Sequence, residues 1–319
     1  MLDARLEELR ARQTQVAVGG ILEGDELAEK QFSFREVVLR RFMAHPLAKW
    51  GLLGLVIMLA LSYGSPVWHA LFPNYIQAPD QFTLADASQG PSLRHLFGTD
   101  SYNGHDILSL ILFGGRLSLL IGIGSMILAT TIGVTVGACA GYFGGIADAV
   151  LMRITDVLLT IPALLIVPLA ARIFAADSAL NIAIIFGFLS WMAMARIVRS
   201  SFLSLREMQF TEAARAVGVP AYRIIYRHLL PNAIGPIVVV FTLGIALNIV
   251  LEAFISFLGF GIQPPTYSWG STLAGAQGVL IQGNWWWITF PGLAIVATVL
   301  CINFIGDGLR DALDPKMVQ

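Results

Sequence analysis

Residues 117–142 read LSLLIGIGSMILATTIGVTVGACAGY, and this stretch contains no Asp, Glu, Lys or Arg. A helix of about 20 apolar residues is long enough to cross the hydrocarbon core of a bilayer. Further charge-free stretches cover residues 50–79, 178–195 and 253–306. Repeated runs of this length predict a protein that crosses a membrane several times.

The overall composition agrees with that prediction. Of the 319 residues, 56% are hydrophobic and 13% are charged, whereas about a quarter of a typical soluble domain is charged. Such a chain has too little polar surface to cover a water-soluble core, which excludes a soluble enzyme. The net charge of −1 gives no excess of basic residues for binding nucleic acid, so we expect no nucleic-acid partner.

The apolar runs predict an all-α polytopic membrane protein with six transmembrane helices. We place these helices at residues 50–72, 117–142, 149–172, 180–199, 236–258 and 288–308. Between the last two lies an uncharged stretch, 259–287, whose Pro264-Pro265 pair and many glycines argue against a seventh regular span. We expect a loop or a partly re-entrant segment there, because irregular backbone is tolerated at membrane depth only inside protein or beside a wet cavity.

The basic residues predict the orientation of the chain. Eight Lys or Arg precede the first helix, six lie between Arg196 and Arg227, and two lie near the C-terminus. The positive-inside rule therefore places these sixteen of twenty, and both termini, in the cytoplasm. The resulting division is a cytoplasmic segment 1–46, a first transmembrane helix 47–72, an external loop 73–116, a core of five transmembrane helices 117–309 that includes a cytoplasmic loop 200–232 and an external loop 259–287, and a cytoplasmic tail 310–319.

The cytoplasmic loop has more defined turn chemistry than a simple connection between two helices needs. Thr211 is expected to cap a short helix that starts at Glu212, where a carboxylate favours the positive helix end. Gly218 suits the left-handed position after that helix, and Pro220 suits the first turn of a second helix that Pro231 ends. Two short helices joined by a sharp corner predict an element that docks on another protein.

The sequence EAARAVG at residues 212–218, followed by LPNA at 230–233, resembles the EAA loop of permease subunits in binding-protein-dependent ABC importers. Other segments resemble the C-type permeases of the oligopeptide/dipeptide/nickel family, and the resemblance covers about residues 41–315. These segments are HLFGTDSYNGHDILSLILFGGRLSL (95–119), GYFGGIADAVLMRITDVLLTIP (141–162), SFLGFGIQPPTYSWG (256–270) and INFIGDGLRDALDP (302–315).

The resemblance implies a type I ABC importer permease fold with a cytoplasmic coupling loop, in the inner membrane. It implies as partners the lipid bilayer, a second permease subunit in a heterodimer, two cytoplasmic ATPase subunits and an extracytoplasmic substrate-binding protein. ATP and Mg would bind to the ATPase subunits, so this chain is expected to be non-catalytic, with no cofactor or metal of its own. The loop residues implied in coupling are Glu212, Ala213, Ala214, Gly218, Arg223, Arg227, Leu230 and Pro231.

The residues themselves support this division of labour. The chain contains three lysines, Lys30, Lys49 and Lys316, and none of them belongs to a GxxxxGK[ST] loop. Without such a loop the chain lacks the usual cradle for the phosphates of ATP. We therefore expect the energy for transport to come from another subunit.

Ionisable residues inside the predicted helices are functional candidates, because an unpaired charge in a membrane is costly. Arg153 and Asp156 are three residues apart, and we expect them to pair on one face of the third helix near the inner surface. Glu252 has no charged neighbour in the sequence. It either lines the translocation path or accepts hydrogen bonds from another helix or from loop backbone, and Asn248, one turn earlier, shares either task.

Three functions are compatible with a membrane protein of this kind. The leading one is a permease subunit of an ATP-driven importer, and peptides are the commonest cargo of the family that it resembles. The alternative is an ion-coupled secondary transporter that uses Asp156 or Glu252, although the long docking loop and the lack of an evident inverted repeat argue against it. An intramembrane enzyme is the least favoured, since the sequence has no HExxH pair. The sequence leaves open whether the cargo is a peptide, a nickel complex, an opine or an oligosaccharide.

Overall fold

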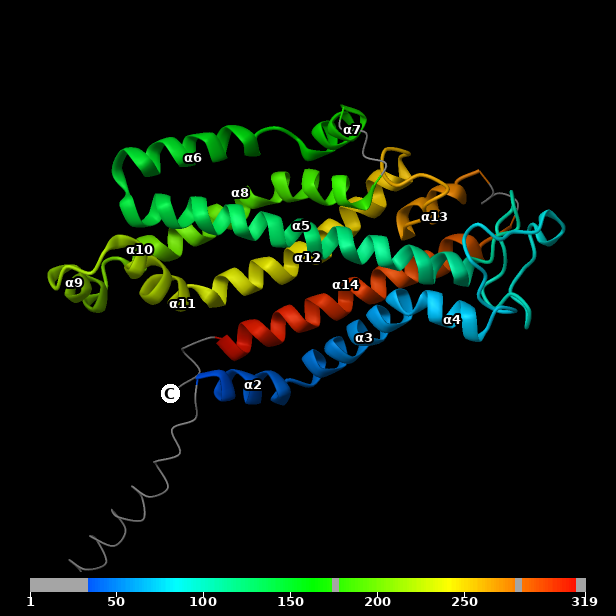
Figure 1. The fold of residues 1–319 in the computed structure, drawn as a ribbon, viewed down its shortest axis with the longest axis horizontal. Coiled ribbons are helices and arrows are strands. Elements are labelled where there is room, and N and C mark those ends of the chain that lie inside the picture. The colour runs from blue at the N-terminus through cyan, green and yellow to red at the C-terminus, as the bar shows by residue number, and fades with distance from the viewer. Residues whose placement is uncertain (1–33, 174–177, 279–282, 314–319) are drawn as a thin grey trace, which may run out of the picture.

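The computed structural model describes residues 34–173, 178–278 and 283–313, and its long helices lie side by side along the longest axis of the molecule (Figure 1). No β-strand occurs in these ranges. In chain order the elements are α2 (Phe34–Ala44), α3 (Pro46–Tyr63), α4 (Ser65–Leu71), the 3₁₀ turn η1 (Leu84–Asp86), α5 (Ile107–Phe143), α6 (Gly145–Leu159), α7 (Ala163–Ile173), α8 (Ala179–Leu205), α9 (Gln209–Ala216), α10 (Ala221–Ile224), the π-helical turn η2 (Ile225–Leu229), α11 (Leu230–Asn232), α12 (Ile234–Phe257), α13 (Trp269–Gly275) and α14 (Trp286–Leu313).

Within the described residues, five helices are long and apolar enough to cross a membrane: α3, α5, α8, α12 and α14. α6 and α7 pass the same test only as a pair, and they are bent by 87° at the break between them. The predicted regular helix over 149–172 is therefore wrong. The break covers residues 160–162, where Pro162 lacks an amide hydrogen and disfavours helical geometry in the residue before it.

Helix α5 begins ten residues before the predicted start at Leu117, so residues 107–116 do not belong to the preceding loop as predicted. Asp106 caps the helix, because its side chain accepts a hydrogen bond from the Ser109 amide at 2.9 Å. Arg116 consequently lies within the helix. A single arginine does not stop a helix, since its long side chain can carry the charge to the membrane interface. The loss of charge in the sequence marked a membrane boundary rather than the start of a helix.

The centre of the bundle is the contact between α5 and α8. Gly133, Gly137 and Gly141 follow one another at helical spacing and all face α8. A methyl group at Gly133 would lie 2.6 Å from Cβ of Met194, and one at Gly141 would lie 2.6 Å from Cβ of Phe202. These glycines therefore let the two helices approach more closely than larger residues would allow.

The N-terminal helices lie at the edge of this bundle. α3 packs on α14 through Gly51, where a methyl group would lie 2.9 Å from Cβ of Phe304. Only 17% of the apolar window of α3 is buried, against 56% for α8. α3 is thus an added peripheral span, and the frame of the molecule consists of α5, α8, α12 and α14.

The charged residues at the two ends bracket a bilayer. Gly137 of α5 packs on Ala195, the neighbour of Arg196, so Arg196 lies near the level of Gly137. Between Arg116 and this level α5 rises about 30 Å, at about 1.5 Å per residue. This length equals the thickness of a typical hydrocarbon core, about 30 Å. We therefore expect one membrane boundary near Arg116 and the other near Arg196.

Candidate functional site

The connection between α8 and α12, residues 206–233, projects from one end of the bundle as two short helices (Figure 1). The chain turns at Gly218, whose φ of +81° lies in the left-handed region that favours glycine. The Gly218 amide donates to the carbonyl of Arg215 at 2.9 Å, and the Val219 amide donates to that of Ala214 at 3.0 Å. The predicted left-handed turn at Gly218 is confirmed.

The start of the first short helix differs from the prediction. α9 begins at Gln209 rather than at Glu212, and Thr211 does not cap it. The Thr211 hydroxyl is buried and donates to the carbonyl of Leu205 at 2.9 Å. Thr211 therefore ties α9 to the end of α8. Glu212 still lies in the first turn of α9, near the positive end of the helix.

The predicted end of the second short helix at Pro231 is also wrong. α10 continues into the π-helical turn η2 and then into α11. Pro231 occupies the first turn of α11, where a missing amide hydrogen is tolerated. The Asn232 side chain donates to the carbonyl of His228 at 2.6 Å and supports this turn. The helical path is interrupted only at Ala233, before α12 begins.

Buried side chains hold this connection on the bundle. Ile224 and Leu229 are fully buried and belong to the main apolar core. The guanidinium of Arg215 lies over the Tyr142 ring at 5.1 Å from its centroid. Arg206 donates to the carbonyl of Gly141 at 3.2 Å. The connection is thus fixed against the end of α5.

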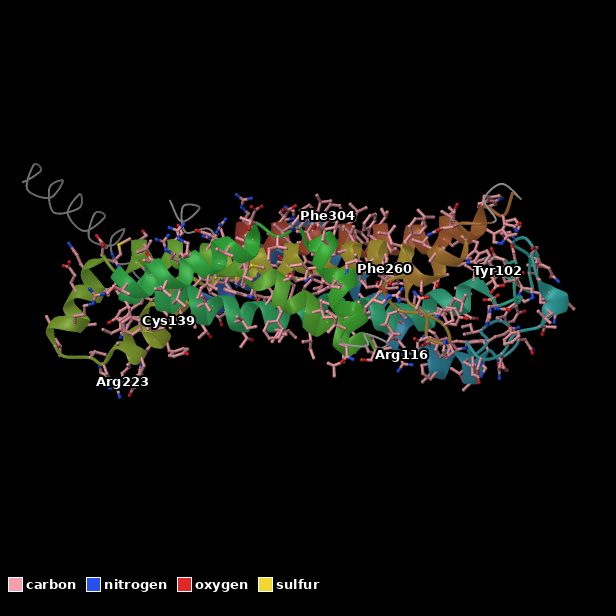
Figure 2. All side chains as sticks on the ribbon, turned by 90° about the horizontal axis from the view of Figure 1, so that it is seen from above. Tyr102, Arg116, Cys139, Arg223, Phe260 and Phe304 are labelled. Carbon is pink, nitrogen blue, oxygen red and sulfur yellow. The ribbon has the colours of Figure 1, made fainter. Side chains whose placement is uncertain are left out.

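Other side chains of the connection are exposed, and many of them are apolar. Val217 is 84% exposed, Tyr226 63% and Tyr222 60%. Figure 2 shows Arg223 at this extreme end of the molecule. Large exposed apolar side chains interspersed with charged ones are typical of a protein interface. We call the following exposed residues the docking face: Met208, Phe210, Glu212, Val217, Tyr222, Arg223, Tyr226 and Arg227.

The remaining residues predicted for coupling lie beside the docking face. Ala213 and Pro231 are exposed, and Ala214 and Leu230 are half-buried. Ala214 and Leu230 pack against the main apolar core. The structure therefore brings all the predicted loop residues together at one end of the bundle.

The predicted ion pair between Arg153 and Asp156 is corrected by the structure. Asp156 pairs with Arg196 of α8 at 2.5 Å, and both side chains are 52% exposed. One turn further along α8, Arg199 donates two hydrogen bonds to Asp148, of which the one from Nη2 to Oδ2 measures 2.6 Å. The prediction considered partners within one helix, whereas the neighbouring helix supplies both cations. These pairs fasten α6 to α8.

Glu252 is 1% exposed and closes a hydrogen-bond network between two helices and a loop. Ser118 donates to its Oε2 at 3.1 Å, and Ser256 donates to its Oε1 at 2.7 Å. The same serines accept backbone amides, Ser118 from Trp269 at 3.1 Å and Ser256 from Ile262 at 3.2 Å. This geometry favours the hydrogen-bonding role over the path-lining role for Glu252.

Asn248 has a similar position one turn earlier in α12. It is 4% exposed. Its amide group donates to Ser125 of α5 at 2.8 Å, and its carbonyl oxygen accepts from Ser190 of α8 at 3.2 Å. Asn248 therefore joins three helices inside the subunit.

The uncharged stretch between the last two spans contains the short helix α13. Ser268 caps it in a reciprocal capping box with Ser271. Trp269 is buried and donates from its indole nitrogen to the carbonyl of Ile111 at 2.9 Å. A methyl group at Gly270 would lie 2.8 Å from Cβ of Ser256. The segment thus packs tightly against α5 and α12 without crossing the bundle.

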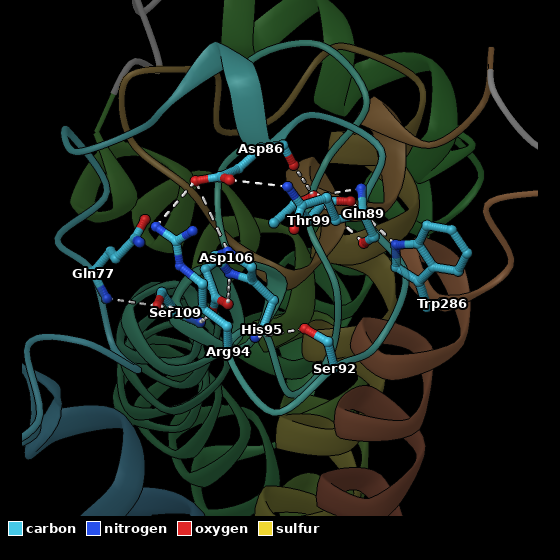
Figure 3. Close-up of polar contacts among 10 residues, drawn as sticks. All are labelled: Gln77, Asp86, Gln89, Ser92, Arg94, His95, Thr99, Asp106, Ser109 and Trp286. Atoms are coloured by element: carbon cyan, nitrogen blue, oxygen red, sulfur yellow. Dashed lines mark hydrogen bonds and ion pairs between the residues drawn. The ribbon is translucent and has the colours of Figure 1, made fainter.

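A polar cluster closes the opposite end of the molecule, where α5 begins (Figure 3). His95 is 1% exposed, with Nδ1 at 3.0 Å from Asp106 Oδ2 and Nε2 at 4.0 Å from Asp86 Oδ2. Gln89 donates to Asp86 at 2.9 Å. This cluster fixes the N-terminus of α5 to the irregular segment that precedes it. We call residues 72–106 the cap. Sequence reasoning missed this cluster, because its residues lie in an irregular segment whose sequence has no helical or strand periodicity.

A second buried pair in the cap joins Asp100 and His105. Asp100 Oδ2 lies 2.6 Å from His105 Nδ1, and Oδ1 accepts the amides of Asn103 and Gly104 at 2.6 and 2.8 Å. Burial raises the pKa of Asp100, but the hydrogen bonds from His105 and from these amides outweigh it and hold the pKa below its usual value. Asp100 therefore keeps a negative charge inside the cap.

Metal chemistry finds no support in the described part of the chain. No group of three or more His, Cys, Asp or Glu side chains there is arranged to hold a metal ion. Cys139 and Cys301 are free thiols.

Comparisons with known proteins agree with this architecture. Residues 133–319 match the family described as binding-protein-dependent transport system inner membrane component. The glutathione transport system permease protein GsiD of Pectobacterium atrosepticum is 39% identical, over 87% of this chain and 90% of that protein. The oligopeptide transport system permease protein OppC of Haemophilus influenzae is 37% identical, over 92% of this chain and 93% of that protein.

Among solved structures, an inward-facing conformation of the MetNI methionine ABC transporter shares the fold. It aligns with a TM-score of 0.51 at 22% identity, over 64% of this chain and 96% of that chain. The alternative of an ion-coupled secondary transporter is not favoured by these likenesses. The chain therefore belongs to the family of binding-protein-dependent transport system inner membrane components, and it is a multi-pass permease subunit of an ABC importer.

Proposed function

We propose that this chain forms half of the translocation path of an ATP-driven importer for di- or oligopeptides. The observation that carries the proposal is the docking face, which exposes large apolar side chains at one end of a membrane-spanning bundle. Relatives named for glutathione and oligopeptide transport support peptides as the cargo. The chain itself performs no chemistry in this proposal.

In this proposal, partner proteins meet both ends of the bundle. The docking face meets cytoplasmic ATPase subunits, two per complex, which bind ATP and Mg and hydrolyse the nucleotide. A second permease subunit forms a heterodimer with this chain and completes the path. A substrate-binding protein delivers the peptide to the cap, on the other side of the membrane.

Coupling requires that the ATPase makes different contacts with the permease in two states, since an equilibrium shifts only through differential contacts. In our proposal Glu212 pairs with a basic group of the ATPase, and Gly218 fixes the angle between α9 and α10. Arg206 and Arg215 contact the end of α5, so movement of the connection reaches a transmembrane helix.

We infer a structural role for the buried polar residues of α12. Glu252 and Asn248 are enclosed within the subunit and bonded to neighbouring helices, so they hold the frame rather than line the path. In the same way the pair of Asp156 and Arg196, at a membrane boundary, fixes the position of α6.

The proposed orientation has both termini in the cytoplasm, and cysteine labelling tests it. Single cysteines at Ala85 in the cap and at Gln277 after α13 should react with an impermeant thiol reagent added outside intact cells. A cysteine at Ala216 in α9 should react only after permeabilisation. Labelling of the Ala216 site from outside would contradict the orientation.

The docking proposal is tested by charge substitution in the purified complex in liposomes. Val217→Asp places a charge on the most exposed apolar residue of the docking face, and we expect loss of ATPase binding and at least a tenfold fall in ATP-driven peptide uptake. Ser204→Asp, an exposed site on the last turn of α8 at the same end, is the matched control and should transport normally. Equal uptake by both variants would refute the assignment of the docking face.

A further inference from the structure

A pocket of about 290 Å³ lies between the cap, the segment before α13 and the start of α14. It is separate from the docking face and from the Glu252 network. Leu110 of α5 contributes an apolar wall. The side chains that give the pocket its chemistry are Asp100, Tyr102, Gln263, Tyr267, Ser271 and Trp287.

Three aromatic rings line this pocket. Tyr102 and Trp287 meet edge to face, with their ring centroids 5.6 Å apart. Tyr267 packs on His105, the partner of Asp100, with ring centroids also 5.6 Å apart. The electron-rich faces of aromatic rings attract cations, including a primary ammonium group such as that of lysine.

The charge of the pocket has the sign that complements such a cation. Asp100 Oδ1 is saturated by amide donors, but Oδ2 contacts only His105 and has one lone pair left. Burial, and then the negative charge of Asp100, raise the pKa of Tyr267, so this charge is felt across the pocket. No Lys or Arg is among the residues that line it.

We propose that this pocket binds the free α-ammonium group of a peptide substrate at the cap end of the permease. In this arrangement the ammonium lies between the rings of Tyr102 and Tyr267 and donates to Asp100 Oδ2. Gln263 offers a polar group for the first peptide bond. The choice of a peptide rests on the proposed function, whereas the preference for an organic cation rests on the pocket alone.

A free peptide terminus fits this site better than an inorganic cation does. A metal ion needs several oxygen or nitrogen ligands, and no group of three or more acidic, imidazole or thiol side chains is suitably placed in the described residues. Aromatic faces and a single available carboxylate oxygen instead suit an organic ammonium group, which donates to one charged acceptor and rests against the rings.

The experiment measures peptide binding to the purified transporter complex without its substrate-binding protein. The probes are trialanine and N-acetyl-trialanine, which differ in the charge of the terminus, titrated by calorimetry. Because a charge-assisted hydrogen bond is worth about 1.5–3 kcal/mol, we expect the complex to bind trialanine at least about tenfold more tightly. Acetylation should lose this advantage.

Variants locate the discrimination in the pocket. Asp100→Asn keeps the Oδ1 acceptor for the amides but removes the charge, and it should lose most of the discrimination between the two peptides. Tyr102 is 57% exposed, so Tyr102→Leu removes a ring with little effect on folding and should reduce the discrimination at least threefold. Asp80→Asn removes an exposed charge from the cap outside the pocket and should behave as the unaltered protein.

Two results would show that the pocket does not recognise the charged terminus. One is equal affinity of the unaltered complex for the two peptides, and the other is full discrimination in both Asp100→Asn and Tyr102→Leu. Equal competition by N-acetyl-lysine amide would show that any ammonium binds, which overturns the assignment to the peptide terminus. ATP-driven uptake of trialanine is measured in parallel, with the substrate-binding protein present. Absence of uptake by the unaltered complex would refute the proposed peptide importer. Uptake together with equal affinity for the two peptides would refute only the proposed pocket.

Discussion

In the cap, the buried side chains of Asp86, His95 and Asp106 contact one another, whereas at the opposite end Val217, Tyr222 and Tyr226 are at least 60% exposed. The first region obtains its polar contacts from within the subunit. The second is held from behind by Ile224 and Leu229 but presents apolar groups outward. The contrast teaches that buried polar contacts hold the irregular chain of the cap together, whereas buried apolar side chains hold the docking face on the bundle.

The largest effect is expected at the docking end, from Gly218→Val. No atom lies within 4 Å of a methyl group built at Gly218, so the substitution acts only through the φ of +81° and not through a clash. A β-branched residue is strained there, and the corner between α9 and α10 should open. We expect peptide uptake and substrate-stimulated ATP hydrolysis in liposomes to be abolished.

Gly218→Asn is the matched control, because asparagine tolerates the left-handed region. It should retain most of the uptake. Unaltered uptake by Gly218→Val would mean that the corner does not carry coupling, and the contrast between the two ends would lose its functional meaning.

The next effect concerns the frame between the two ends. Glu252→Leu leaves the hydroxyls of Ser118 and Ser256 without their acceptor, and each unsatisfied buried group costs about 1–3 kcal/mol. We expect a lower yield of folded complex and a lower unfolding temperature, with normal uptake per folded complex. Glu252→Gln keeps an acceptor oxygen and should be milder. Normal assembly of Glu252→Leu but altered transport would place this residue in the path.

A smaller effect depends on pH and belongs to the cap. The pKa of Asp100 is held below its usual value in the folded state, so the stabilisation is present above the unfolded pKa of about 3.9 and is lost as the pH falls through the folded pKa. We expect the amides of residues 102–104 to lose hydrogen-exchange protection in acid, after correction for intrinsic rates. Asp100→Asn should remove this dependence. A protection pattern that is unchanged in acid would refute the assigned role of the carboxylate.

The smallest effects are expected in α6, from substitutions of Asp156 and Arg153. The pair that Asp156 forms with Arg196 is half exposed, and such pairs contribute about 0–1 kcal/mol. Asp156→Asn should shift thermal unfolding little, and Arg153→Ala should shift it even less. A large destabilisation by Arg153→Ala would restore the pair that was predicted within one helix.

The apolar runs were sufficient to predict the spans α8, α12 and α14, and most of the predicted helix ends lie within a few residues of the observed ones. This succeeds because a segment that crosses a membrane must be apolar along its length, which is visible in the composition. The same argument misplaced the start of α5, since Arg116 lies inside a helix that begins at Ile107. It also missed the 87° bend before α7, although Pro162 was a visible signal.

The side-chain contacts between distant parts of the chain were harder to predict than the helices. Gly218 was identified from local turn chemistry, which needs only neighbouring residues. Ser118 and Glu252 are separated by 134 residues, and Arg196 and Asp156 by 40, so their pairing depends on how the helices are packed. The residues of the cap network follow no sequence periodicity and no known motif, so their contacts are visible only in the three-dimensional structure.

Helix α5 has a mechanical consequence. It starts at the cap with Asp106 and ends at Gly144, near the Arg206 guanidinium, and its glycines clamp it to α8. Its 37 residues form a rod about 55 Å long. A tilt of such a rod by about 5° moves one tip by about 5 Å relative to the other, by simple geometry on that length. A movement of α9 that tilts this rod is thus transmitted to the cap, and α8 must tilt together with α5 because the glycines hold the two helices in close contact.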